Sequence, residues 1–293
     1  MNLEKWLKEN TESLKDKTVA ISGSTGGIGA ELCDYLAWLG ANLIFLDRNE
    51  KKAAALNKSL KQKYGELKTD YIKLDLEDID SVKNATESLK ELKPDILILN
   101  AGAYSIPRHK CSTGYDNVFQ INFASPYYIV KELKPILEEN NGRVVAVGSI
   151  AHNYSKTDME DFDFRSSKKA SLVYGNAKRF LMFSLLSLYD GEKGLSIVHP
   201  GITFTNITAH YPKLIFAVIK HPMKVIFMKP KVACLSILKG VFEDCKENQW
   251  IGPRLFDVWG RPKKKILKTC KRAEREQIFL KAEQIYEDMK KYF

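Results

Sequence analysis

Residues 17–29 of the chain read KTVAISGSTGGIG, and this stretch decides the fold. Thr18–Ile21 is a short apolar run of the kind that forms a buried strand, and four glycines follow it: Gly23, Gly26, Gly27 and Gly29. The next residues, AELCDYLAWLG, repeat apolar side chains at helical spacing and end on a glycine. Strand, glycine-rich turn and helix together form a cradle for a pyrophosphate, because the backbone can approach the phosphates and the helix N-terminus supplies free N–H donors. We therefore predict a dinucleotide site, the alternative being a turn that only connects two elements.

Composition limits the class of protein. The chain has 293 residues, of which 44% are hydrophobic, enough for one large α/β domain. It has no uninterrupted apolar run of about 18 residues, so we expect no membrane span. The charged N-terminus is unlike a signal peptide, and the five cysteines are odd in number and have no metal-binding spacing. We expect a cytoplasmic protein without a metal site.

The formal net charge of +10 lies in the last third of the chain. Residues 1–204 carry 27 basic and 27 acidic side chains, whereas residues 205–293 carry 19 and 9. A basic end of this kind can meet nucleic acid, an anionic membrane or an acidic partner, or it can be a solvated face. Aromatic residues are not interleaved with these cations as a base-stacking platform requires, so nucleic acid is disfavoured.

Strands and helices alternate along the chain. Predicted strands follow the first at 42–46, 70–74, 95–99, 142–147 and 195–198, and predicted helices lie at 50–64, from about 81, within 113–137, and at 171–189 and 271–291. This alternation predicts an α/β fold, a Rossmann-like doubly wound parallel sheet of about seven strands with helices on both faces. We divide the chain into an N-terminal amphipathic helix (1–16), a dinucleotide-binding and catalytic core (17–206), and a substrate-covering segment with basic C-terminal helices of the same domain (207–293).

Asp47 and Arg48 end the second predicted strand, the place where such a fold meets the adenosine ribose. A carboxylate there accepts hydrogen bonds from the ribose hydroxyls and repels a 2′-phosphate, whereas an arginine pairs with that phosphate. Asp47 stands directly at the strand end, and the glycine turn holds no basic residue. NAD is therefore slightly favoured over NADP, with two solvated loop charges as the alternative.

Three further polar positions follow strands or interrupt apolar runs. Asp75 follows the third strand and either accepts a hydrogen bond from the adenine amino group or is a turn residue. Asn100-Ala101-Gly102 ends the fourth strand with small residues that leave room for a flat ligand. Asn122 interrupts an apolar helical stretch, so it must be hydrogen-bonded, either as a brace of the fold or as part of a site.

Tyr174 and Lys178 are four residues apart on a predicted helix and therefore share one face of it. A phenol with a pKa of about 10 is a poor acid or base at neutral pH. A neighbouring ammonium and a cationic nicotinamide lower that pKa. Ser149 emerges at the carboxyl end of the fifth strand, where it can hold a carbonyl oxygen while the tyrosine donates a proton and hydride reaches the carbon. His152 begins the polar stretch 152–170, predicted as a surface loop or short helix, and is predicted to be a loop residue and not a catalytic base.

Taken in order, these motifs resemble the classical short-chain dehydrogenase/reductase family over roughly residues 17–206. The matching motifs are Gly23-x-x-x-Gly27-x-Gly29, Asp75, Asn100-Ala101-Gly102, Asn122, Ser149, Tyr174-x-x-x-Lys178, and Pro200-Gly201 through Thr205. The resemblance implies an NAD(P)-dependent oxidoreductase in which Tyr174 is the acid/base, Lys178 binds the ribose hydroxyls and lowers the tyrosine pKa, Ser149 orients the substrate and Asn122 holds a proton-relay water. The cofactor contacts expected with this resemblance are Gly23, Ser24, Gly27, Ile28, Gly29, Asp47, Arg48, Asp75, Leu76, Asn100, Ala101, Gly102, Tyr174, Lys178, Pro200, Gly201, Thr203 and Thr205, the last two near the nicotinamide amide.

Within that family the chain is similar to the retinol-dehydrogenase-like branch. The stretch TGYDNVFQINF, the long spacing from Ser149 to Tyr174 and the late stretch WIGPRLFDVWGRP carry this similarity. The branch usually favours NADP, whereas Asp47 precedes Arg48 here, and Gly148 stands where a second serine is common. The glycine turn also fits the G-x-x-G-x-x-G pattern of extended-type sugar epimerases, but the short chain and the order of the other motifs oppose that reading.

Residues 211–228, YPKLIFAVIKHPMKVIFM, are apolar with interspersed lysines. In this fold they would cover the substrate pocket, and their side chains suit a small apolar alcohol or carbonyl substrate. Peripheral membrane contact through residues 211–231 and plain core packing are the alternatives. A homo-oligomer is left open. The alternative to an enzyme is a non-catalytic dinucleotide-binding regulatory or scaffold protein, which the intact Ser149, Tyr174 and Lys178 oppose.

Overall fold

In the computed structural model, which describes residues 3–167, 169–203 and 228–292, one eight-stranded sheet has the order β3-β2-β1-β4-β5-β6-β7-β8. The strands are β1 (Thr18–Ser22), β2 (Asn42–Asp47), β3 (Thr69–Lys73), β4 (Ile96–Leu99), β5 (Arg143–Val147), β6 (Leu195–Val198), β7 (Gln249–Leu255) and β8 (Trp259–Ile266). Strands β1 to β7 are parallel, and β8 is antiparallel to β7. The order of the strands reverses between β1 and β4, which is where doubly wound folds bind dinucleotides.

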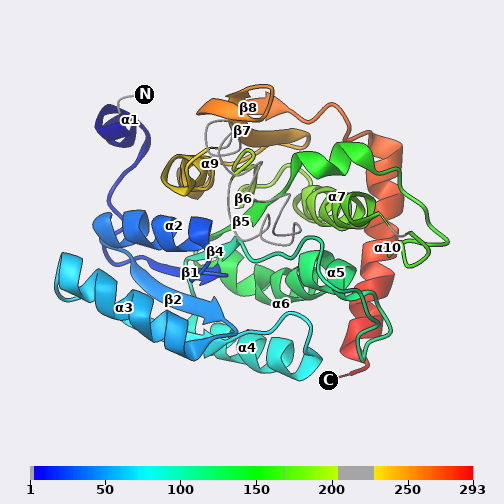
Figure 1. Ribbon diagram of the computed structural model, residues 1–293, viewed down its shortest axis with the longest axis horizontal. Coiled ribbons are helices and arrows are strands. Elements are labelled where there is room, and N and C mark those ends of the chain that lie inside the picture. Colours follow the sequence, from blue (N-terminus) through cyan, green and yellow to red (C-terminus); the bar gives the residue numbers. More distant parts are fainter. Residues whose placement is uncertain (1–2, 168, 204–227, 293) are drawn as a thin grey trace, which may run out of the picture.

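Helices cover both faces of the sheet (Figure 1). One face packs against α1 (Leu3–Asn10), α2 (Gly27–Trp38), α3 (Glu50–Tyr64) and α9 (Pro230–Phe242). The other packs against α4 (Ile79–Leu92), α5 (Asn117–Phe119), the π-helix η1 (Gln120–Ala124), α6 (Ser125–Glu139), α7 (Ala170–Tyr189) and α10 (Arg272–Lys290). The predicted α/β class, the helices on both faces and the parallel order of the first strands are confirmed.

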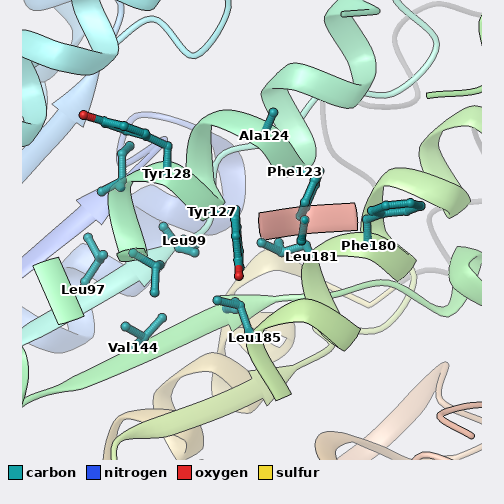
Figure 2. Packing of buried hydrophobic residues seen from close by; sticks show 14 of the residues in the cluster. Leu97, Leu99, Phe123, Ala124, Tyr127, Tyr128, Val144, Phe180, Leu181 and Leu185 are labelled. Atoms are coloured by element: carbon teal, nitrogen blue, oxygen red, sulfur yellow. The ribbon is translucent and has the colours of Figure 1, made fainter. Parts of the chain in front are cut away.

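Aromatic and aliphatic side chains fill the layer between α6, α7 and the sheet (Figure 2). Phe123 of η1 lies between Tyr127 of α6 and Phe180 of α7, with ring centroids 5.4 and 5.2 Å apart. All three side chains are fully buried, and burial of one such ring contributes about 1.5–3 kcal/mol. This packing holds α7 against the sheet, with its first turns at the carboxyl edge of the strands.

The sequence did not reveal the last two strands, which form a hairpin, so the prediction of about seven parallel strands missed the antiparallel strand β8. Each of these two strands contains a proline, a residue that is atypical of strands. Pro253 lies opposite Pro262, beyond the single residue pair, Val198 with Ile251, that joins β7 to β6. Because proline has no N–H to donate, it is tolerated at such a sheet edge.

Three local predictions need correction. The helical region predicted at 113–137 begins at Asn117 and contains the π-helical turn η1, within which Asn122 lies. Residues 150–154 form a 3₁₀ helix, η2 (Ile150–Tyr154), and His152 is fully buried in it, so it is not a surface-loop residue. The C-terminal helix α10 is not wholly part of a solvated face, the alternative considered for this basic end of the chain, because Ile278 and Met289 lie in the core against α6 and α7.

Part of the sequence prediction falls on residues that the structure does not describe. Thr205 and most of the apolar segment 211–231 lie outside the described residues. Among the helices that the structure describes, none has the length and apolar character to cross a membrane.

The glycine turn gives a first test. A Cβ at Gly29 would lie 2.1 Å from the carbonyl oxygen of Gly23, whereas a Cβ at Gly26 would lie 3.3 Å from the same atom. We expect Gly29→Ala to force the helix away from the turn and to destabilise the protein by about 1–3 kcal/mol, with Gly26→Ala as the milder matched control. Thermal unfolding of both variants measures this, and equal melting temperatures would contradict it.

Candidate active site

The glycine-rich turn joins β1 to α2 and fits a pyrophosphate. Gly23 has a φ of +66°, which an L side chain rarely adopts, and a Cβ there would meet Ala101 at 3.1 Å. The helix cap, Gly26, makes no side-chain hydrogen bond, and the first turn of α2 holds no acidic residue. No side chain of the cap or of the first turn therefore accepts from the N–H groups at the start of α2. These N–H groups are suited to donate to phosphate oxygens.

Asn100 supports this turn from the neighbouring strand. Its side-chain amide donates to the carbonyl oxygens of Ser22 and Gly23 at 3.0 and 3.1 Å. The Ser22 hydroxyl in turn accepts from the backbone N–H groups of Asn100 and Ala101, both at 3.0 Å. Asn100, predicted as a cofactor contact, thus shapes the turn, and the carboxyl ends of β1 and β4 are fixed to one another.

Asp47 is already engaged by the glycine turn. Its carboxylate accepts hydrogen bonds from the Ser24 hydroxyl, from the Thr25 backbone N–H at 3.2 Å and from the Thr25 hydroxyl at 2.9 Å. Asp47 as a whole is 8% exposed. The next residue, Arg48, is exposed, and within the described part of the chain its guanidinium has no ion-pair partner.

Asp75 and Leu76 occupy the turn between β3 and α4. One Asp75 carboxylate oxygen accepts from the Glu77 N–H at 3.1 Å, an arrangement that closes a local turn. The carbonyl oxygen of Leu76 accepts from Gln120 at 3.2 Å and from the Ser125 hydroxyl at 2.7 Å. Both predicted contact residues therefore have structural partners here, with the second carboxylate oxygen of Asp75 making no hydrogen bond within the described residues.

Asn122 braces the loop that follows β4. Its amide donates to the carbonyl oxygens of Ala103 and Val118, each at 2.8 Å, and its Oδ1 accepts from the Ala103 N–H at 3.3 Å. A Cβ at Gly102 would lie 2.7 Å from that Oδ1 and 3.5 Å from the Lys178 Nζ. Gly102, Asn122 and Lys178 therefore meet at one point, and the π-helical turn is what brings the asparagine there.

Lys178 is a buried cation, 2% exposed, whose Nζ donates to the Val147 carbonyl oxygen at 2.9 Å. Burial lowers the pKa of Lys178 to about 8. Its Nζ lies 5.8 Å from the centroid of the Tyr174 ring. A positive charge at this position would favour the phenolate of Tyr174.

Tyr174 faces Ser149. Burial raises the pKa of Tyr174 to about 12, a hydrogen bond with the Ser149 side chain acts in the lowering direction, and Tyr104 raises the pKa further. The Tyr104 and Tyr174 rings meet edge to face with centroids 5.3 Å apart. Without cofactor, burial therefore outweighs the lowering of the tyrosine pKa expected from the sequence, and Tyr174 carries its proton at neutral pH.

The remaining predicted positions line the carboxyl ends of β5 and β6. Gly148 has a physical reason to lack a side chain, because a Cβ there would lie 2.7 Å from the Met182 sulfur. Pro200 and Gly201 follow β6, Gly201 with a φ of +85°, and Thr203 pairs with Met228 through an isolated parallel bridge. The predicted residues that end or follow the strands β1 to β6 thus lie at one edge of the sheet, because these strands are parallel.

Sequence reasoning missed a buried chain of contacts behind Ser149. His152 Nδ1 lies 2.6 Å from the Ser149 carbonyl oxygen, and its Nε2 lies 2.7 Å from the Thr269 hydroxyl. Burial lowers the pKa of His152, which favours the neutral ring that accepts at one nitrogen and donates at the other. The C-terminal segment therefore fixes the loop that carries Ser149. No motif marks Thr269, which is 117 positions from His152 in the sequence.

A second contact links the same segment to the helix of Tyr174 and Lys178. Arg179 donates from Nε to Glu274 at 2.7 Å, pairs with the other oxygen of that carboxylate at 2.5 Å, and donates to the His152 carbonyl oxygen at 3.1 Å. These hydrogen bonds hold α7, η2 and the start of α10 in one arrangement. The only signal in the sequence was that Arg179 follows Lys178.

A cavity of about 440 Å³ lies elsewhere, lined by residues that include Lys110, Arg165 and Tyr292. None of the predicted catalytic residues borders it. The candidate site is therefore defined by the contacts among its own residues, and this cavity is not part of it.

The family model for the short chain dehydrogenases matches residues 17–172, more than half of the chain. The chain belongs to this family. It is 33% identical over 216 residues to the chloroplastic short-chain dehydrogenase TIC 32 A of Brassica napus, and the aligned region covers 67% of each chain. It is 27% identical over 272 residues to mouse retinol dehydrogenase 14, covering 82% of this chain and 81% of that one. Among solved structures, an uncharacterized protein of Mycobacterium paratuberculosis matches 95% of this chain and 96% of its own with a TM-score of 0.72 at 22% identity.

Membership in the family, within a retinol-dehydrogenase-like branch, makes the protein an NAD(P)-dependent oxidoreductase. The residues present fit such a cofactor. The open helix N-terminus after β1 suits the pyrophosphate, and the switch point between β1 and β4 leads from that turn to Lys178 and Tyr174.

The contact between Thr269 and His152 gives a second test. We expect Thr269→Val, which keeps the side-chain shape and removes the hydroxyl, to lower kcat about tenfold, by the worth of one buried hydrogen bond, and to leave cofactor affinity unchanged. Thr269→Ser restores the hydroxyl and serves as the matched control. Steady-state kinetics with a cofactor titration separate the two quantities, and a variant with the kcat of the wild type would contradict a positioning role for Thr269.

Proposed function

We propose that the protein transfers hydride between a nicotinamide cofactor and an apolar alcohol, ketone or aldehyde, with Tyr174 as the acid/base. The observation that carries the proposal is the position of the buried Lys178 ammonium, which is held by the carbonyl oxygen at the end of β5 and lies 5.8 Å from the centroid of the Tyr174 ring. Ser149 follows the same strand, and its side chain acts to lower the pKa of Tyr174. The motif order in the sequence and the family support this assignment.

When bound, the cofactor supplies or accepts the hydride. In carbonyl reduction, the Ser149 hydroxyl holds the substrate oxygen, and Tyr174 donates its proton to that oxygen as the hydride reaches the carbon. A protonated phenol is the state that reduction requires, and the raised pKa of Tyr174 supplies it at neutral pH. Oxidation of an alcohol needs the phenolate, which Lys178 stabilises only while its amine is protonated, below its pKa of about 8.

The choice between NAD and NADP depends on Asp47 and Arg48. The sequence favoured NAD because Asp47 ends β2 directly. The side chain of Asp47 is instead occupied by three donors of Ser24 and Thr25, and the exposed Arg48 is the charge left for a phosphate. We propose a preference for NADP, with the 2′-phosphate held by Arg48.

An apolar substrate is the proposed class. The relationship to a retinol dehydrogenase supports a hydrophobic alcohol or its carbonyl form. Side chains beside the site have the same character, since Tyr104 contacts the Tyr174 ring and the Met228 sulfur would lie 2.9 Å from a Cβ at Gly201. A non-catalytic dinucleotide-binding protein remains the alternative, and it predicts no turnover on any carbonyl or alcohol.

Substitution of the proposed acid tests the mechanism. We expect Tyr174→Phe to lower kcat by about 10²–10⁴-fold, because the general acid is lost, and to leave cofactor affinity unchanged. The matched control is Tyr154→Phe, since Tyr154 is 60% exposed and is not part of the site. Turnover of a panel of apolar aldehydes, ketones and alcohols measures the effect. A fully active Tyr174→Phe variant would show that another group transfers the proton.

Cofactor preference is tested by fluorescence titration with NADPH and NADH. We expect wild type to bind NADPH more tightly and Arg48→Ala to weaken NADPH binding at least about tenfold, because a charge-assisted contact is removed, with little change for NADH. Arg254→Ala is the control, because Arg254 is an exposed arginine on β7, whereas Arg48 follows β2. Tighter binding of NADH by wild type, with Arg48→Ala neutral, would instead support NAD and a role for Asp47.

A further inference from the structure

The turn between β7 and β8 exposes large apolar side chains. Leu255 is 53% exposed, Phe256 is 83% exposed and Trp259 is 40% exposed. We call residues 254–261 the hairpin tip. Figure 1 places the hairpin at the border of the molecule, next to α9. Single exposed apolar residues are ordinary, whereas three within five positions at one turn form a patch that requires an explanation.

The backbone conformation at the hairpin tip is unfavourable for Phe256. Phe256 and Asp257 have φ values of 51° and 59°, and the Val258 N–H donates to the Leu255 carbonyl oxygen at 2.9 Å to close the turn. Asparagine and glycine are the residues that such two-residue turns prefer, and a bulky side chain is rare at positive φ. Phe256 therefore does not serve the turn, and its ring projects into solvent.

Positive charge surrounds this apolar patch. Arg254, Arg261 and Lys263 are exposed, and within the described residues none of them has an ion-pair partner. The one acidic residue of the hairpin tip, Asp257, is neutralised by Lys265. The tip is thus complementary to an anionic surface.

The hairpin tip lies beside the candidate active site. Because β7 is parallel to β6, it ends at the same edge of the sheet. A Cβ at Gly201 would lie 2.8 Å from the Val258 carbonyl oxygen and 3.0 Å from the Pro253 ring. The turn that carries the exposed rings therefore adjoins the loop that follows β6, where predicted cofactor contacts lie.

A bilayer fits this patch better than a protein partner does. A stable protein interface buries about 800 Å² on each side, more than a turn of a few residues offers. Aromatic side chains with adjacent cations bind the interfacial region of an anionic bilayer instead, each cation strengthening the attachment by attraction to the headgroups.

We propose that the hairpin tip docks the protein on an anionic lipid bilayer, with Leu255, Phe256 and Trp259 inserted at the headgroup boundary and the basic residues Arg254, Arg261 and Lys263 on the phosphates. Docking needs no turnover, so it goes beyond the proposed function. Its consequence for an apolar substrate rests on that function: the substrate would pass from the bilayer to a site next to the docked surface.

Sedimentation of the full chain with vesicles tests the docking. The vesicles contain phosphatidylcholine and phosphatidylserine in equal parts, with pure phosphatidylcholine for comparison. We expect binding to the anionic vesicles that weakens with salt. Phe256→Asn suits the positive φ and should preserve the melting temperature, yet weaken binding about tenfold. The double variant Arg261→Gln and Lys263→Gln should weaken vesicle binding more than Phe256→Asn does, by about fivefold for each of the two charges.

Matched controls sit on other faces. Leu280→Asn removes an apolar side chain that is 65% exposed on α10, and Lys58→Gln removes an exposed charge on α3; neither should change binding. Turnover of a water-soluble carbonyl by Phe256→Asn, measured without vesicles, should equal that of wild type, which separates docking from catalysis. Wild type that stays in the supernatant at low salt would overturn the proposal. So would full binding by Phe256→Asn, which would assign attachment to another segment such as 211–231, or a concentration-dependent dimer that Phe256→Asn abolishes.

Discussion

The hydrogen bond from the Lys178 ammonium to the Val147 carbonyl oxygen is the contact on which the candidate site depends. It joins α7 to the carboxyl end of β5 and places a cation in a buried position. Burial makes an unpartnered ammonium costly, so the hydrogen bond sets the position of α7 along the strand. Tyr174 lies one helical turn away, and the side chain of Ser149, two residues after β5, acts to lower its pKa.

Two supports surround that contact. The aromatic packing of Phe123, Tyr127 and Phe180 holds α7 against the sheet, and the π-helical turn of η1 directs Asn122 at the loop after β4. On the other side, Thr269 and Glu274 reach His152 and Arg179 from the C-terminal segment. The catalytic geometry proposed here therefore depends on residues outside the stretch that the family model matches.

Much of the fold could be predicted because its cues are local. The helix predicted at 50–64 has the observed bounds of α3, and the glycine turn, the strand ends and the Tyr174–Lys178 spacing follow from short patterns. The sequence was a poorer guide to which groups a given side chain contacts. Asp47 was assigned to a ribose from its place at the strand end, but Ser24 and Thr25 occupy its carboxylate. The hairpin β7–β8 escaped notice because its prolines and lysines are atypical of strands.

The sequence by itself determined the α/β class, the dinucleotide cradle and the set of side chains at the candidate site, since each depends on periodicity or on spacing within one element and its turn. Only the tertiary structure decided the burial of His152, its link to Thr269 and the exposure of Phe256. These properties depend on which distant segments come into contact, and a buried histidine and a solvated one look alike in a sequence. The pKa values of Tyr174 and Lys178 belong with them, because burial, and not the neighbouring residue in the motif, dominates both.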